Sequence, residues 1–154
     1  MSLEVYIGNH QDQTLIPEAW LTTLESASPE IVRLALAHAT VQPSPLALLA
    51  TLEVALVDDE TSSHVHEQFM DIQGPTDVIT FHHGEIVIGA QVAARQAAEY
   101  GEPLARELLR YFVHGLLHLA GHDDQEDDER EQMETVQEAI VRSLWTAELE
   151  QRLS

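Results

Sequence analysis

The stretch that decides the fold reads Leu104-Ala-Arg-Glu-Leu-Leu-Arg-Tyr-Phe-Val-His-Gly-Leu-Leu-His-Leu-Ala-Gly-His-Asp-Asp124. Its apolar residues recur at intervals of three and four, which predicts a helix with one apolar face. Pro103 stands where a helix commonly begins, and Gly121 stands where a helix commonly ends in a left-handed turn. We therefore expect a helix over most of this stretch, ended by a sharp turn of the chain.

Two histidines, His114 and His118, lie four residues apart within this helix. One helical turn rises about 5.4 Å, so both imidazoles project from one face, one above the other. This is the geometry that two nitrogens need to bind a single Zn²⁺ ion at about 2.0–2.1 Å each. The pair therefore predicts a metal site, in preference to two ordinary surface or core histidines.

The third ligand has two candidates, Asp124 and His122. On a continuous helix His122 would lie about 12 Å along the axis from His114, too far to share one ion. If the chain turns at Gly121, Asp124 takes the third-ligand position of the H-x-x-x-H-x-x-G-x-x-H site. We predict one zinc ion per chain, bound by His114, His118 and Asp124 with a water in the fourth position. His122 remains the alternative third ligand.

Gly115 follows the first histidine directly. The proteolytic H-E-x-x-H helix carries its general base at this place, so the present helix supplies no such base. Glycine inside a helix costs about 1 kcal/mol relative to alanine. We therefore expect another element to pack closely against Gly115, and we regard a peptidase as disfavoured.

Three blocks of the sequence resemble the YbeY-type endoribonucleases, which are ribosomal RNA maturation factors. The block from His114 to Asp124 is similar to the family signature H-G-x-L-H-L-x-G-[YH]-D-H. The segment Gly74-Pro-Thr-Asp-Val-Ile-Thr-Phe81 resembles P-T-[DN]-V-L-S-F, and Gly84-Glu-Ile-Val-Ile88 resembles the strand G-D-I-x-I. The blocks also match in order and spacing, so the resemblance extends over about residues 50–135.

The resemblance implies a fold and a function. The fold is α/β (α+β), with one mixed four-stranded sheet, surrounding helices and a central helix that carries the metal-binding histidines. The function is that of a zinc-dependent hydrolase, an endoribonuclease specific for single-stranded RNA. Such an enzyme acts in 16S rRNA 3′-end maturation and ribosome biogenesis and uses a zinc-activated water. Two alternatives remain open: a non-catalytic, metal-stabilised ribosome-assembly factor, and a metallopeptidase-like hydrolase.

Two positions depart from the family pattern. The third family histidine is Asp124 here, and a carboxylate makes the site less positive than an imidazole would. The family arginine upstream of Pro-Thr-Asp corresponds to Met70, and the family asparagine corresponds to His66. The second departure removes a cation from the cleft in which the resemblance places the RNA.

Other side chains must then contact the RNA. We predict Arg110, His66 and His82 as substrate-binding residues. Arg110 lies one turn before His114 and is expected on the same face of the helix. Its alternative role is an ion pair with an acid such as Glu107.

The charge of the chain is unusual for a protein that handles RNA. There are 27 acidic residues against seven basic ones, which gives a formal net charge of −20. Nucleic-acid-binding proteins usually carry a basic stripe, so tight non-specific RNA binding is disfavoured. A metal ion and a few arginines can still reverse the potential within one cleft. The acidity either keeps the protein soluble or serves to bind basic ribosomal proteins.

The chain has 154 residues and no cysteine. This length predicts one domain, spanning residues 1–154. The lack of cysteine suits a cytoplasmic protein, because disulfides and thiolate metal sites are excluded. We see no signal peptide, and no apolar run reaches the ~20 residues that cross a membrane. No membrane partner is expected. The family resemblance implies RNA as the partner, and the acidic charge adds basic ribosomal proteins as candidate partners.

Strand and helix patterns alternate along the chain. Two of the expected strands are separated only by His82 and His83, which predicts an antiparallel hairpin. The alternation favours an α/β or α+β fold with one mixed sheet. Strands are expected over residues 3–9, 50–57, 76–81 and 84–88. Further helices are expected over residues 17–40, with a break at Ser28-Pro29, and over 58–70, 89–100 and 125–151, and a loop over 42–45.

Overall fold

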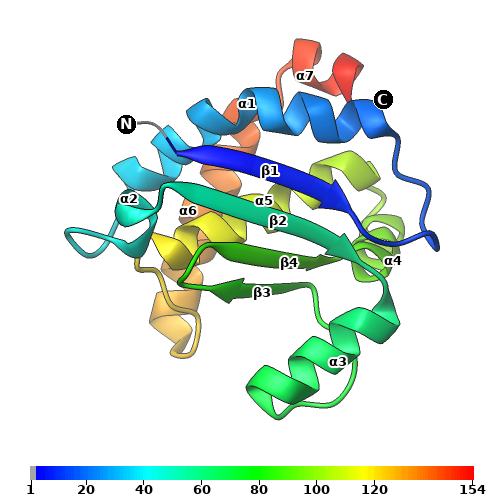
Figure 1. Cartoon of the computed structure of the whole chain (residues 1–154). Helices are drawn as coiled ribbons and strands as arrows, with labels where there is room; N and C mark the ends of the chain where they lie inside the picture. The colour runs from blue at the N-terminus through cyan, green and yellow to red at the C-terminus, as the bar shows by residue number, and fades with distance from the viewer. Residues whose placement is uncertain (1–2) are drawn as a thin grey trace.

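A four-stranded mixed sheet forms the centre of the computed structural model, which describes residues 3–154 (Figure 1). The strands follow the order β1-β2-β4-β3 across the sheet. β2 pairs in parallel with β1 and β4, while β3 pairs antiparallel with β4 at one edge. The predicted fold class and the predicted hairpin are confirmed. The strands are β1 (Glu4–Asn9), β2 (Thr51–Val57), β3 (Val78–Phe81) and β4 (Glu85–Gly89).

Helices surround the sheet, and the longest of them cover one face. In Figure 1, α5 and α6 run behind the sheet, and α3 stands apart from them below β3. No described helix is both long and apolar enough to cross a membrane. The helices are α1 (Glu18–Ala37), α2 (Pro45–Leu48), α3 (Asp59–Met70), α4 (Ala90–Tyr100), α5 (Leu104–Leu119), α6 (Asp127–Leu144) and α7 (Ala147–Arg152).

The central helix is α5, which packs against α1, α2, α4 and α6 and against strands β3 and β4. Its side chains are buried from Ala105 to Leu119 at every position except four. The four exceptions follow one another at intervals of four, so they form a single polar stripe along one side of the helix. The stripe consists of Arg106, Arg110, His114 and His118.

The sheet and α5 meet through alternating apolar side chains. Leu52, Val54 and Leu56 of β2 point toward α5, together with Ile86 and Ile88 of β4. Each such side chain contributes about 1.5–3 kcal/mol when it is fully buried. This contact fixes the distance and rotation of α5 above the sheet, and therefore the direction of its polar stripe.

The packing of α5 on β4 is closest at Gly115. A Cβ atom added there would lie 2.8 Å from Cδ1 and 2.9 Å from Cγ2 of Ile86. The close contact predicted for this glycine is confirmed. It brings the backbone of α5, and the two histidines on either side of Gly115, close to the sheet.

A second, smaller apolar cluster lies on the opposite face of the sheet. Val57, Ile79 and Val87 form its buried centre, and Val65 of α3 and Phe81 of β3 pack against it. The cluster attaches α3 beside the edge strand β3. The residues at the end of α3 are thereby held at the same edge of the sheet as the hairpin.

The expected break in the first helix is wrong, because α1 continues through Pro29. Proline lacks an N–H, so it cannot donate to the carbonyl of Glu25, four residues earlier. The hydroxyl of Ser28 donates to this carbonyl at 2.7 Å instead. The side chain before the proline therefore satisfies the carbonyl that the proline leaves free.

Two further boundaries differ from expectation. The last helix does not run from 125 to 151, because the backbone leaves the helical conformation at Trp145 and a new helix, α7, begins. The Thr146 side chain caps α7 by accepting a hydrogen bond from the N–H of Leu149 at 3.2 Å. The expected loop at 42–45 passes into the short helix α2, which Ser44 caps in the same way.

Candidate metal site and cleft

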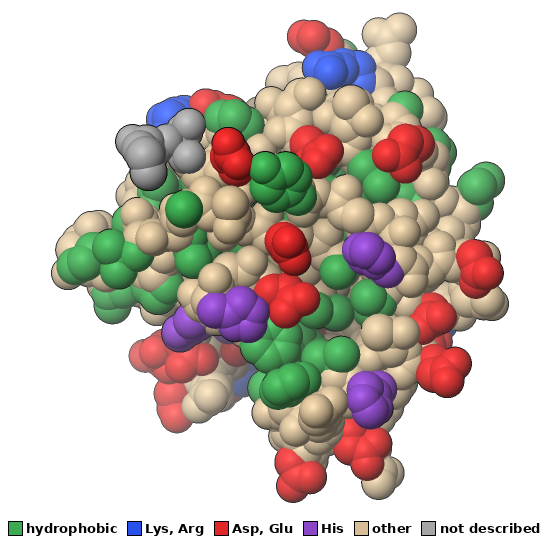
Figure 2. Space-filling view, in the orientation of Figure 1, with side chains coloured by type: hydrophobic (Ala, Val, Ile, Leu, Met, Phe, Trp, Pro, Cys, Tyr) green, Lys and Arg blue, Asp and Glu red, His purple; other side chains and the backbone are tan. Residues whose placement is uncertain are grey.

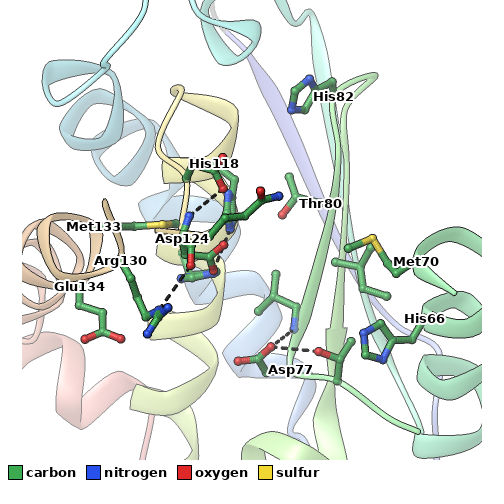
Figure 3. A pocket seen from close by; sticks show the side chains of 16 residues that line it. His66, Met70, Asp77, Thr80, His82, His118, Asp124, Arg130, Met133 and Glu134 are labelled. Carbon is green, nitrogen blue, oxygen red and sulfur yellow. Dashed lines mark hydrogen bonds and ion pairs between the residues drawn. The ribbon is translucent and has the colours of Figure 1, made fainter. Parts of the chain in front are cut away.

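Three side chains with metal-binding atoms meet at the C-terminal end of α5 (Figure 3). The Nε2 atoms of His114 and His118 each lie 3.6 Å from Oδ2 of Asp124. The two imidazole rings are 4.7 Å apart between centroids and nearly perpendicular. The structure thus brings together the three residues that the sequence predicted as ligands.

A sharp turn after α5 brings Asp124 back to the histidines. Gly121 has a φ of 104°, a backbone conformation that residues other than glycine rarely adopt. The N–H of His122 donates to the carbonyl of Leu117 at 2.9 Å and closes the turn. The N–H of Thr40, which follows α1, donates to the carbonyl of Ala120 at 3.0 Å. The turn is therefore held both by its own hydrogen bonds and by the segment after α1.

His122 lies outside the site and supports it from behind. Its side chain is buried, and its Nε2–H donates to the carbonyl of His38 at 2.8 Å. Its own carbonyl accepts a hydrogen bond from Nδ1 of His118 at 3.0 Å. Asp124, and not the alternative His122, therefore stands beside the two histidines. His122 instead fixes the ring orientation of His118.

The three residues fit a tetrahedral divalent ion. Ligands about 2.0–2.1 Å from a tetrahedral ion lie about 3.3–3.4 Å from one another, close to the 3.6 Å observed here. Burial, together with the neighbouring His114, lowers the pKa of His118. The neutral imidazole, which is the form that binds metal, is thereby favoured at neutral pH. Two nitrogens and one carboxylate oxygen are a donor set that suits Zn²⁺.

The site opens into a cleft with a volume of about 580 Å³. One wall is formed by α5 and the first turns of α6, and the other by β3, the hairpin and the end of α3 (Figure 3). His66 and Met70 of α3 and His82 of the hairpin line the second wall. The cleft therefore leaves one side of the three-ligand group accessible to a substrate.

His66 presents one defined nitrogen to this cleft. Its Nδ1 lies 2.9 Å from the carbonyl oxygen of Gly74, which can only accept a hydrogen bond. The proton of the neutral ring is therefore on Nδ1, and Nε2 remains as an acceptor. Met70, at the position of the family arginine, is more than half exposed and offers no charge.

Arg110 does not line the cleft. Its guanidinium binds Glu138 in a bidentate manner, at 2.7 and 2.9 Å, and also pairs with Glu102 and Glu107. Burial lowers the pKa of Arg110, but the three carboxylates outweigh burial and raise it above its ordinary value. The structure thus shows the ion pairing that was the alternative for this residue, and the guanidinium of Arg110 does not face the cleft.

A cation that sequence reasoning missed does line the cleft. It is Arg130, in the first turns of α6, and it is the one lysine or arginine among the described residues that form the lining. It pairs with Asp127 at 3.1 Å on the exposed surface. In the sequence, Arg130 lies within an acidic run, where an arginine ordinarily forms an exposed ion pair with a neighbouring acid. Only the fold shows that Arg130 lines the cleft, because the first turns of α6 lie beside the end of α5 that carries the candidate metal ligands.

Among the charged side chains in Figure 2, the red acidic ones are spread over the visible face, whereas blue basic ones are few. Within the cleft, the carboxylates of Asp77, Asp123, Asp124 and Glu134 stand against the single arginine. A substrate with phosphate groups therefore meets a negative lining unless a metal ion changes the local potential.

The fold and the site together define an α+β protein with a candidate three-ligand metal site at an open cleft. The central helix supplies two of the ligands, and the turn after it supplies the third. Residues 7–145 match the family model described as Endoribonuclease YbeY. The chain therefore belongs to the YbeY endoribonuclease family, as its sequence blocks indicated.

Individual relatives agree with this membership. The chain is 38% identical over 144 residues to an Endoribonuclease YbeY of Streptomyces coelicolor, covering 80% of this chain and 84% of the relative. It is 35% identical over 153 residues to the Endoribonuclease YbeY of Cutibacterium acnes, covering 84% and 95%. A solution structure of a Thermotoga maritima protein superposes with a TM-score of 0.61 at 26% identity, covering 92% of this chain and 89% of that chain.

Proposed function

We propose that this protein is a zinc-dependent endoribonuclease that cleaves single-stranded RNA, with a role in 16S rRNA 3′-end maturation and ribosome biogenesis in the cytoplasm. The observation that carries the proposal is the meeting of His114, His118 and Asp124 at an open cleft in a chain of the YbeY family. One ion per chain would be held by these three residues. A precursor of ribosomal RNA is the proposed substrate, and basic ribosomal proteins are proposed partners of the acidic surface.

The chemistry follows from the ligand set. A zinc ion held by three protein ligands supplies a Lewis acid that lowers the pKa of water and polarises a phosphoryl oxygen. His114, His118 and Asp124 would hold the ion, and the other residues of the cleft would orient the RNA beside it. Because Asp124 contributes a negative charge where the family pattern has a histidine, we expect a weaker pull on phosphate and slower cleavage than with three histidines.

The remaining cleft residues would position the RNA. Arg130 can donate to a phosphate oxygen, and Nε2 of His66 can accept a hydrogen bond from a base or a 2′-hydroxyl. His82 lies on the same wall of the cleft, in the hairpin turn after β3. Since the negative lining repels phosphate, contacts to bases and hydroxyls should carry much of the binding.

One alternative has an observation in its favour. The acidic lining and the uncharged Met70 suit a non-catalytic ribosome-assembly factor in which the metal only stabilises the fold. A test separates the two functions: purified protein is incubated with a single-stranded RNA oligonucleotide, with chelator, and with chelator followed by excess zinc. The proposal expects cleavage that the chelator stops and zinc restores. Intact RNA in all three reactions would support the assembly factor. In a separate assay with casein as substrate, digestion of the casein would indicate a peptidase.

Changing Arg130 to glutamine should weaken binding of single-stranded RNA by about fivefold to tenfold, because one charge-assisted phosphate contact is lost. The slope of log affinity against log salt should also become shallower by about 0.7, the value for one phosphate contact on a single strand. Fluorescence anisotropy at several salt concentrations measures both quantities.

The matched control is Arg33→Gln. Arg33 also forms an exposed ion pair three residues along its helix, but it lies on α1 and outside the cleft lining. An equal loss of RNA binding in both variants would show that Arg130 acts only through net charge.

Changing Met70 to arginine should have the opposite effect. A guanidinium at this exposed position in the cleft can bind a phosphate bidentately, so we expect RNA binding severalfold tighter. The salt slope should steepen by about 0.7. Leu48→Arg adds the same charge at an exposed position of α2 outside the cleft. If Leu48→Arg tightens binding as much as Met70→Arg, the site of the new charge is irrelevant and the cleft does not bind the RNA.

A further inference from the structure

The metal ligand His114 is hydrogen-bonded to a side chain of another helix. Its Nδ1 lies 2.7 Å from Oε1 of Gln137 on α6. Gln137 is buried, with 8% of its surface exposed, although glutamine is mostly found at the surface. A buried amide of this kind needs a partner for each of its polar atoms, so its contacts are informative.

The neighbouring carboxylate determines which way the amide of Gln137 points. Its nitrogen, Nε2, lies 3.1 Å from Oε2 of Glu138. An ionised carboxylate can only accept hydrogen bonds, so the NH₂ group must face Glu138 and the oxygen must face His114. An amide oxygen also only accepts. His114 must therefore carry its proton on Nδ1, which leaves the lone pair of Nε2 directed toward Asp124.

Glu138 is in turn held ionised by Arg110. The guanidinium donates to both carboxylate oxygens, at 2.7 and 2.9 Å. Burial raises the pKa of Glu138, but hydrogen bonds from Arg110 and Gln137 outweigh burial and bring the pKa below its ordinary value. Glu138 therefore stays an acceptor at neutral pH, and the orientation of the Gln137 amide does not depend on small changes of pH.

The second histidine is held in a different way. His118 donates from Nδ1 to the backbone carbonyl of His122. Replacing a side chain at position 122 leaves this carbonyl in place. Only the support of His114 depends on a side chain, and that side chain comes from a helix that contributes no metal ligand. The orientation of His114 can therefore be altered by mutation without touching a ligand.

We propose that Gln137 is a positioning residue that fixes the tautomer and ring orientation of His114 before any metal arrives, with Glu138 and Arg110 fixing Gln137. This inference rests on the metal site of the proposed function. It gives Arg110 a role at the site although Arg110 does not reach the cleft. It also explains why Gln137 and Glu138 are neighbours in α6: one contacts His114 and the other contacts Arg110 of the polar stripe of α5.

The test compares Gln137→Met, which keeps the size of the side chain but removes the acceptor, with the double variant Gln137→Glu and Glu138→Gln. The double variant keeps an acceptor toward His114 and an amide beside it, so that two carboxylates do not face each other at the 3.1 Å that separates these side chains. Gln132→Met on the exposed side of the same helix is the matched control. Zinc affinity is measured by competition with a chelator. We expect Gln137→Met to lose about 10–100-fold in affinity, the usual range for partners of metal ligands. The double variant Gln137→Glu and Glu138→Gln should keep the affinity or strengthen it, and Gln132→Met should leave it unchanged.

A second readout needs no metal. Long-range proton–nitrogen NMR spectra of the metal-free protein at pH 8 report which ring nitrogen of His114 carries the proton. We expect Nδ1–H in the natural protein and in the double variant Gln137→Glu and Glu138→Gln, and a mixture with Nε2–H in Gln137→Met. If Gln137→Met does not fold, Glu138→Ala replaces it, because it leaves the acceptor in place but frees the amide to rotate, and a similar mixture is expected.

Unchanged zinc affinity and an unchanged His114 tautomer in Gln137→Met, or in Glu138→Ala where it replaces that variant, would overturn the inference. If the natural protein binds no zinc, the proposed function fails. The tautomer measurement then still decides whether Gln137 positions His114.

Discussion

Replacing His114 and His118 together with alanine is expected to abolish stoichiometric zinc binding and RNA cleavage while the chain stays folded. Two of the three ligand atoms are lost, and one carboxylate alone is not enough to hold the ion. Both histidines line the open cleft, so their removal widens the cleft and leaves no closed cavity in the core. We expect the free energy of unfolding in the absence of metal to fall by about 1–3 kcal/mol, because Gln137 loses its partner. Metal content after dialysis, RNA cleavage and thermal melting are the three measurements.

The control replaces His10 and His64 with alanine, since both are exposed and neither belongs to the candidate site. This variant should bind one ion and cleave RNA as the natural protein does. If the His114 and His118 variant still bound one ion per chain with unchanged affinity, the metal site would lie elsewhere.

Replacing Gly121 with alanine is expected to lower the free energy of unfolding by about 2–4 kcal/mol and to weaken zinc binding. A φ of 104° strains any residue with a side chain, at a cost of about 1–3 kcal/mol. The new Cβ would also lie 2.5 Å from Oγ1 of Thr40 and 2.8 Å from Cγ2 of Val41, and such overpacking typically costs about 1–3 kcal/mol. Relief of this crowding moves the turn and with it Asp124. Chemical denaturation and zinc competition measure the two effects.

Gly101→Ala is the matched control. Gly101 also has a positive φ, of 65°, but nothing lies within 4 Å of a Cβ placed there. It should lose only about 1–2 kcal/mol from left-handed strain, with zinc affinity unchanged. Equal losses of stability and zinc affinity in the two variants would mean that the contact between the turn and residues 40–41 does not position Asp124.

The central helix and the meeting of its candidate ligands could be predicted from the sequence because the signals are local. The spacing of His114 and His118 sets their common face, Gly121 marks the turn, and Gly115 marks the close approach to the sheet. The mixed four-stranded sheet was expected from the family resemblance, but the order of its strands was not predicted. It depends on pairings between distant segments, which periodicity within one segment does not reveal.

Other features depended on contacts that no local pattern shows. Pro29 signalled a helix break, and a single hydroxyl of Ser28 satisfied the carbonyl that the break would have freed. Arg110 stood at the right helical spacing to face a substrate, but α6 brings Glu138 onto its stripe. The same placement of α6 brings Arg130 into the cleft. In each of these cases a residue from elsewhere in the chain decided the role.

The central claim is that His114, His118 and Asp124 bind one zinc ion. The most direct test is anomalous diffraction at the zinc edge, from a crystal grown with zinc and without chelator. We predict one strong peak per chain, about 2.0–2.2 Å from both Nε2 atoms and from a carboxylate oxygen of Asp124. A peak coordinated by His122, or a main peak away from the two histidines, would contradict the account.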